Sequence, residues 1–150
     1  MIRIVVYGCP APQGSKSFKG LAKSGRAILA ESSKRVKPWR QDVKAAGIEA
    51  RKGAPPIDGP ILARMVFTLP KPKSAPKTRR TYPDRKPDLS KLVRSTEDAL
   101  TDAGVIADDA RIVEFTRLAK VYPGEDGEAL EAPGVVIYLE SLPTYRTQRR

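Results

Sequence analysis

Three aspartates and one arginine are the residues of this chain whose types and spacing suit metal-assisted chemistry. Asp88 precedes a helical pattern, and Asp108 and Asp109 follow it, within the segment KPDLSKLVRSTEDALTDAGVIADDARIVEF. Carboxylates within an otherwise basic chain favour a site in which a hard divalent cation binds next to a phosphate group of the ligand. The three aspartates are therefore candidate metal ligands, with Asp88 and Asp109 the candidate catalytic pair. Arg94 is a candidate for stabilising negative charge on the phosphate.

Two scarce residue types narrow the chemistry. The 150 residues include no histidine and a single cysteine, Cys9. Histidine-dependent catalysis, an intrachain disulfide and a cysteine-rich zinc site are therefore excluded. Any metal must be held by oxygen, which favours Mg²⁺, with Mn²⁺ as a substitute.

The apolar residues give no sign of a membrane partner. No apolar run reaches the roughly 18 residues of a membrane span. The apolar start of the chain, Met1–Tyr7, is short, is broken by Arg3 and lacks the pattern of a cleaved signal. We therefore expect a soluble, cytoplasmic protein.

Basic and acidic residues are segregated along a chain whose formal net charge is +11. Residues 1–53 hold 12 Lys or Arg against 3 Asp or Glu, and residues 64–94 hold 10 against 2, whereas residues 96–109 hold five acids and no base. Such segregation favours nucleic-acid binding over the alternative, a lysine-rich surface that aids solubility. The candidate DNA contacts are Lys16, Lys71, Lys73, Lys77, Arg79, Arg80, Arg85, Lys86 and Lys91.

Periodic patterns predict the elements that position these side chains. Runs rich in Ile and Val predict strands over 2–7 and 61–69, and apolar residues at helical spacing predict helices over about 38–52 and 89–103. We expect an α+β fold of one small domain, residues 1–150, with a mixed β-sheet packed by two main helices. Segments 111–122 and 135–141 are expected to form a C-terminal β-hairpin. Segments of about 13–26 and 70–87 are expected to be basic loops, and 145–150 a flexible basic tail.

The predicted helix sets the distance between the aspartates. A helix over 89–103 is about 22 Å long, and the five residues that end at Asp109 extend about 17 Å. If they return along the helix, Asp109 reaches Asp88 at the helix N-terminus, where free N–H groups favour a phosphate. Arg94, one turn in from Ser90, would reach the same phosphate. Alternatively, Asp88 caps the helix and Asp108–Asp109 is a solvated turn.

The segment 86–115 resembles the signature of RusA-type Holliday junction resolvases. The similarity is looser over residues 2–18, the KPWRQDV helix and the LPKPKS strand end. The resemblance implies a homodimeric, Mg²⁺-dependent endonuclease that cuts four-way DNA junctions during recombination or repair, with one nick from each subunit. Two symmetric cuts call for two active sites related by a two-fold axis. A bacterial or phage-infected host cell is the setting implied.

Carried over by position, the resemblance places the first and last family carboxylates on Asp88 and Asp109. Arg94 occupies the position of the family's catalytic lysine, and Asp98 matches an acid whose role is structural or unassigned. The second metal-binding aspartate is replaced by Ser90, a neutral and poorer ligand. Asp108, or less plausibly Glu97, is a candidate to supply the missing charge.

The replacement of a metal-binding aspartate by Ser90 leaves two alternatives to an active nuclease. One is a catalytically impaired branched-DNA-binding protein on the same fold. The other is a basic RNA-associated protein, in which the acidic cluster is incidental.

Overall fold

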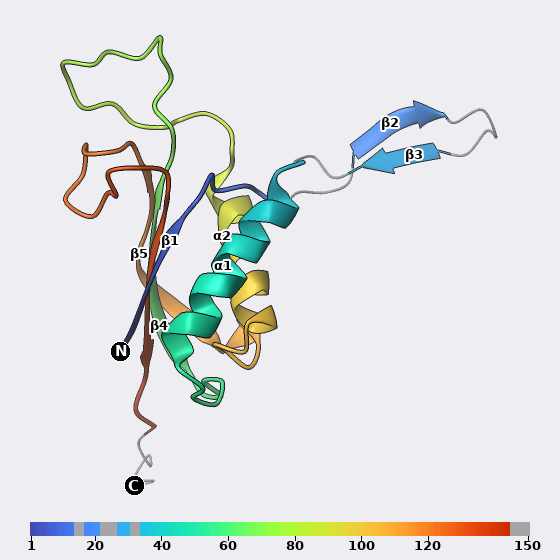
Figure 1. Cartoon of the computed structure of the whole chain (residues 1–150), viewed down its shortest axis with the longest axis vertical. Helices are drawn as coiled ribbons and strands as arrows, with labels where there is room; N and C mark the ends of the chain where they lie inside the picture. The colour runs from blue at the N-terminus through green and yellow to red at the C-terminus, as the bar shows by residue number, and fades with distance from the viewer. Residues whose placement is uncertain (14–16, 22–26, 31–33, 145–150) are drawn as a thin grey trace, which may run out of the picture.

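Two helices pack against a four-stranded sheet, and a separate two-stranded sheet extends away from this body (Figure 1). The computed structural model describes residues 1–13, 17–21, 27–30 and 34–144. In chain order the elements are β1 (Ile2–Tyr7), β2 (Ser17–Leu21), β3 (Ala27–Ala30), α1 (Val36–Arg51), β4 (Ile61–Thr68), α2 (Leu89–Asp102), the 3₁₀ helix η1 (Asp109–Arg111), β5 (Ile112–Val121) and β6 (Gly134–Ser141).

The main sheet is mixed, with the strand order β1-β6-β4-β5. Strand β6 is antiparallel to both of its neighbours, whereas β4 and β5 run parallel. A parallel pair needs a crossover connection, which here consists of the loop 69–88 and α2. Helix α2 therefore runs back along the sheet, with its N-terminal end near the end of β5, where Lys120 Nζ lies 3.0 Å from the carbonyl oxygen of Pro87. Its C-terminal end lies near the start of β5.

The predicted C-terminal hairpin is wrong, because β4 lies between β5 and β6 and pairs with both. The connection over 122–133 is much longer than the roughly two to five residues of a hairpin loop. It is long enough to cross the intervening strand. The rest of the expected class, an α+β fold with a mixed sheet and two main helices, is confirmed.

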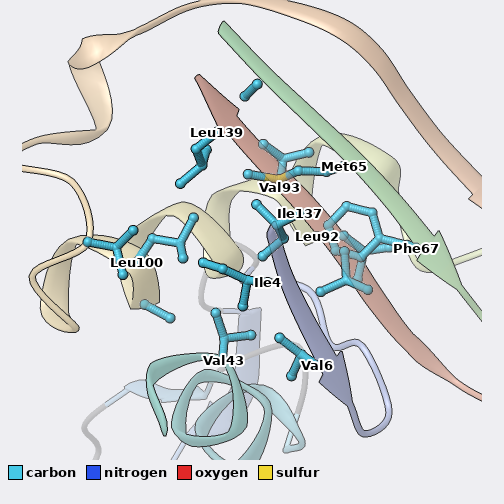
Figure 2. Close-up of a cluster of buried hydrophobic side chains, with 14 of the residues drawn as sticks. Ile4, Val6, Val43, Met65, Phe67, Leu92, Val93, Leu100, Ile137 and Leu139 are labelled. Carbon is cyan, nitrogen blue, oxygen red and sulfur yellow. The ribbon is translucent and has the colours of Figure 1, made fainter. Parts of the chain in front are cut away.

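The hydrophobic core lies between the main sheet and the two helices (Figure 2). Strand β4 alternates between buried and half-buried residues only as far as Met65, and from there to its end every residue is buried. Ala63, Met65 and Phe67 are at most 1% exposed and belong to this core. Leu92 and Leu100 of α2 meet them there. The buried face of α2 is thereby fixed against the sheet, which leaves its polar flank to carry the site.

Helix α1 packs closely against the end of α2. Trp39 is 1% exposed, and its indole Nε1 donates to Thr96 Oγ1 at 3.3 Å. A Cβ on Gly47 would lie 3.0 Å from Val105 Cγ2 and 3.2 Å from Ala103 Cβ. Glycine therefore allows the two helices to approach at this point.

The ends of α2 are those the sequence predicts, to within one residue. Asp88 is the N-cap residue, in an extended conformation. At the other end, Gly104 has a φ of +72° and donates from its N–H to the carbonyl of Thr101, while Val105 donates to the carbonyl of Leu100. These two bonds form a Schellman motif, which satisfies the last carbonyls of the helix.

The two basic segments differ from each other. The expected loop over 13–26 is wrong in part, because residues 17–21 form β2, paired with β3; residues 14–16 and 22–26 lie outside the described chain, as does the expected tail 145–150. All residues of the segment 70–87 are described, and they form no helix or strand. In the part of the chain that the structure describes, neither helix is long and apolar enough to cross a membrane.

Candidate active site

Asp88 lies at the N-terminal end of α2 with an exposed carboxylate. Its side chain is 52% exposed and lies 3.5 Å from Lys91 Nζ. Although Asp88 occupies the N-cap position, its side chain accepts no capping hydrogen bond from the described residues. Its carboxylate is therefore not used to cap the helix. The carboxylate oxygens of Asp88 are therefore accessible to a cation from solvent.

Asp109 lies at the other end of α2, at the start of η1. The hydroxyl of Thr101, in the last turn of α2, donates a short hydrogen bond to Asp109 Oδ1. Asp98, one turn earlier on the helix, lies close enough to Asp109 to raise the pKa of its carboxyl. Asp109 is therefore attached to the C-terminal half of α2.

The prediction that Asp88 and Asp109 meet within one chain is wrong. Helix rise places Asp88 about 20 Å along the axis from Thr101, the partner of Asp109. The segment after α2 pairs with the α1–β4 connection instead of returning along the helix. Ile57 donates to the carbonyl of Val105 and accepts from Ala107 N, both at 3.0 Å. These bonds hold Asp109 at the far end.

Carboxylates crowd together around Asp109. Burial, together with the negative charges of Asp109 and Asp98, raises the pKa of Glu97 to about 7. Burial also raises the pKa of Asp109; the hydrogen bond from Thr101 opposes this, while Asp98 and Asp108 add to the rise. Like charges held this close disfavour one another's ionisation. A cation bound here would relieve that repulsion.

A polar stripe along α2 connects the two acidic ends. Ser90, Arg94 and Glu97 lie on one flank, as their spacing predicts, since residues three and four apart are neighbours on a helix. Ser90 and Arg94 are exposed, whereas Glu97 is partly buried. Arg94 lies one turn from both Glu97 and Asp98, so a phosphate bound beside these acids is within reach of its guanidinium.

Asp108 is engaged in capping. Its Oδ1 accepts from Ala110 N at 2.8 Å and so caps η1. The side chain is exposed and adds negative charge near Asp109. Its position fits the capping role better than the predicted role as a metal ligand, although the carboxylate lies close to the acidic cluster.

The acidic loop over 123–134 already pairs with two of the predicted DNA contacts. Lys71 Nζ lies 2.9 Å from Glu125, and Arg80 Nη2 lies 2.9 Å from Asp126. Arg117 shares Asp126 at 2.7 Å. These ion pairs hold the basic loop against the sheet. Exposed side chains among the other candidates are those of Lys73, Lys77, Arg79, Arg85, Lys86 and Lys91, and Lys16 lies outside the described residues.

The described carboxylates do not form a complete metal site by themselves. Among the described residues, no group of three or more His, Cys, Asp or Glu side chains is placed to hold a metal ion. Mg²⁺ commonly uses one or two protein carboxylates together with waters and substrate phosphates. The Asp98–Asp109 pair fits that partial role.

From the sequence, Glu97 and Asp98 have only minor roles, and Thr101 is not identified as a partner of Asp109. The signal was present, because positions 94, 97, 98 and 101 follow one another along a single helix flank. What the sequence lacks is the information that Asp109 packs against that flank instead of against Asp88.

Comparison with known proteins identifies the class. A family model described as an endodeoxyribonuclease matches residues 8–131, most of the chain, and includes both ends of α2 and the acidic cluster. The chain belongs to this family, RusA, whose members are Holliday junction endonucleases. None of the curated proteins compared with the chain matches it.

Proposed function

We propose that this protein is a homodimeric, divalent-metal-dependent endonuclease that resolves four-way DNA junctions by paired nicks. We further propose that each active site combines Asp98 and Asp109 of one subunit with Asp88 of the partner subunit. The single observation that carries this proposal is the position of Asp88 and Asp109 at opposite ends of α2.

A two-fold axis near the middle of α2 would produce this arrangement. Such an axis exchanges the two ends of the helix, so it places Asp88 of each subunit near Asp109 of its partner. Strand β5 is an edge of the sheet and presents Val113, which is 60% exposed. An unpaired edge with an exposed apolar residue is a natural surface for a second copy. Two equivalent sites would follow, as two symmetric nicks require.

The chain's own residues have distinct roles in this proposal. Asp98, Asp109 and the partner's Asp88 would supply oxygen ligands, and Thr101 would orient Asp109. Arg94 would contact the scissile phosphate and stabilise its developing charge. A bound Mg²⁺ or Mn²⁺ would lower the pKa of an attacking water and polarise the phosphate. The exposed basic residues of the loop 70–87 would bind the flanking backbone.

A second function is favoured by Ser90. This exposed serine lies in the first turn of α2, two residues from Asp88, where the resemblance places a metal-binding aspartate. A hydroxyl contributes no negative charge, so the protein would bind branched DNA and cut it slowly. The family match supports DNA, in preference to RNA, as the partner in either case.

A nicking assay on a four-way junction with Mg²⁺ or Mn²⁺ separates these functions. We expect the unmodified protein to cut, Asp109→Asn to lose cleavage, and Ser90→Asp to cut faster. Cleavage by Ser90→Asp alone would establish the binding protein with an impaired site. Cleavage that persists in Asp109→Asn would remove Asp109 from the mechanism.

A further inference from the structure

A cavity of about 310 Å³ lies beside the N-terminal end of α2. Its walls come from three segments, 9–12 after β1, 69–72 after β4 and 83–87 before α2, and Arg35 and Tyr122 complete the lining. It is separate from the acidic cluster at the other end of the helix.

The lining is apolar and rigid. Proline fixes its own backbone angle and has no N–H donor, so its ring offers a flat hydrocarbon surface without hydrogen-bonding groups. Such a surface suits the face of a planar ring better than the edge of one. The six prolines that line the cavity are Pro10, Pro12, Pro70, Pro72, Pro83 and Pro87.

Hydrogen bonds fix both sides of the cavity. On one side, Ser95 Oγ donates to the carbonyl of Ala11 at 2.6 Å, in a buried contact. On the other side, Lys120 Nζ donates to the carbonyls of Arg85 and Pro87, each at 3.0 Å. The cavity is therefore formed before any ligand arrives, which is typical of small-molecule sites.

The rim is positively charged. Arg35, Arg85 and Lys86 line the cavity with exposed side chains. An apolar interior with a cationic rim is complementary to a planar apolar body that carries anionic groups. Ligand sites commonly have volumes of about 300–1,000 Å³, and this cavity is at the lower end of that range. Its size therefore limits the occupant to a single ring system. These properties together describe one nucleotide.

We propose that this cavity receives one unstacked nucleobase of the bound DNA strand, with the flanking phosphates on the cationic rim. The proposal rests on the proposed DNA-binding function and adds a feature of the substrate. Because Asp88 directly follows the lining residue Pro87, the strand would be fixed next to a proposed metal ligand. Extruding a base costs least where the duplex is already disturbed, so the cavity would favour a branch point, where continuous stacking is interrupted, over a continuous duplex.

The test uses Cys9, the one cysteine of the chain, which lies in the lining. Alkylation with N-ethylmaleimide would fill the cavity after the protein has folded, so the modification does not interfere with folding. The matched control is the double variant Cys9→Ser/Lys44→Cys, alkylated at the exposed face of α1. The probe is a four-way junction with 2-aminopurine at each nucleotide flanking the crossover in turn, in buffer without divalent cations. Junction binding is followed in parallel by gel shift.

We expect the unmodified protein and the alkylated control to raise 2-aminopurine fluorescence several-fold at one position. Alkylation at Cys9 should abolish this rise while the junction remains bound. Bound junction with unchanged fluorescence at every position would overturn the proposal, as would a full rise with the Cys9 adduct. Absence of junction binding by the unmodified protein would instead refute the DNA-binding function, and the proposal with it.

Discussion

The hydroxyl of Thr101 donates a hydrogen bond to the carboxylate of Asp109 and so attaches Asp109 to the last turn of α2. Together with the backbone pairing of residues 105–107 with Ile57, this contact keeps Asp109 at the C-terminal end of α2, most of the length of the helix away from Asp88. It also opposes the rise in the pKa of Asp109 that burial causes.

Loss of this hydroxyl should make nicking more sensitive to acid. In Thr101→Val, the carboxylate loses a donor that favours its charged form, so the pKa of Asp109 should rise further. We expect the acidic limb of the nicking pH profile to move to higher pH, so that nicking at a fixed acidic pH becomes slower. Thr101→Ser keeps the donor and should retain the original profile. Equal pH profiles for all three proteins would show that the hydrogen bond does not tune Asp109.

Glu97 should destabilise the folded protein at alkaline pH. Its folded pKa, about 7, exceeds the ordinary value of 4.5. Between these values the folded state keeps a proton that the unfolded state has released, so stability falls as pH rises through this window. Glu97→Gln should be more stable by about 1 kcal/mol at pH 8, after allowance for solvent screening, and unchanged at pH 4. Urea unfolding at both values measures this, and a variant that is less stable at pH 8 would contradict the assignment.

The ion pairs of Asp126 should stabilise the folded protein at neutral pH and lose this effect in acid. This pH dependence is opposite to that of Glu97. The hydrogen bond from Arg117, the N–H of Glu128 and the charge of Arg80 hold the pKa of Asp126 well below 3.8. Its contribution is therefore present above pH 3.8 and is lost as pH falls below that value. Asp126→Asn should lower the free energy of unfolding by about 2 kcal/mol at pH 7. Asp84→Asn, at an exposed site, is the control. Equal losses in the two variants would exclude a special role for Asp126.

Exposed lysines of the basic loop should contribute to DNA affinity through counterion release. Lys77→Ala should weaken junction binding and reduce the slope of log K against log salt by about one. Lys44→Ala removes the same charge from the exposed face of α1 and should leave the slope unchanged. Titrations at several salt concentrations measure both slopes. A similar change in the two variants would indicate a response to net charge alone.

The sequence predicts those parts of the fold that depend on local patterns. Strand β1 and helices α1 and α2 follow from apolar periodicity, and the ends of α2 follow from Asp88 and Gly104. The pairing of β5 and β6 with β4 depends on contacts between distant segments, which strand patterns do not specify. The predicted hairpin failed for that reason.

The candidate site also has some features that the sequence predicts and others that it does not. The acidic residues and Arg94 were recognisable by type and by helical spacing. The position of Asp109 was not, because it depends on the pairing of residues 105–107 with Ile57. A chain-length argument allowed Asp109 to reach Asp88, and a competing set of backbone hydrogen bonds holds it elsewhere.

Subunit mixing tests the central claim, an active site shared between two copies of the chain. Asp88→Asn and Asp109→Asn should each abolish nicking as homodimers. After subunit exchange, a heterodimer of the two has one site with both substitutions and one site with none. We therefore predict that nicking returns on mixing, with one strand cut per junction. Two separately mixed batches of Asp88→Asn serve as the control. Persistent inactivity of the mixture, with heterodimers demonstrated by differential tags, would contradict the shared site.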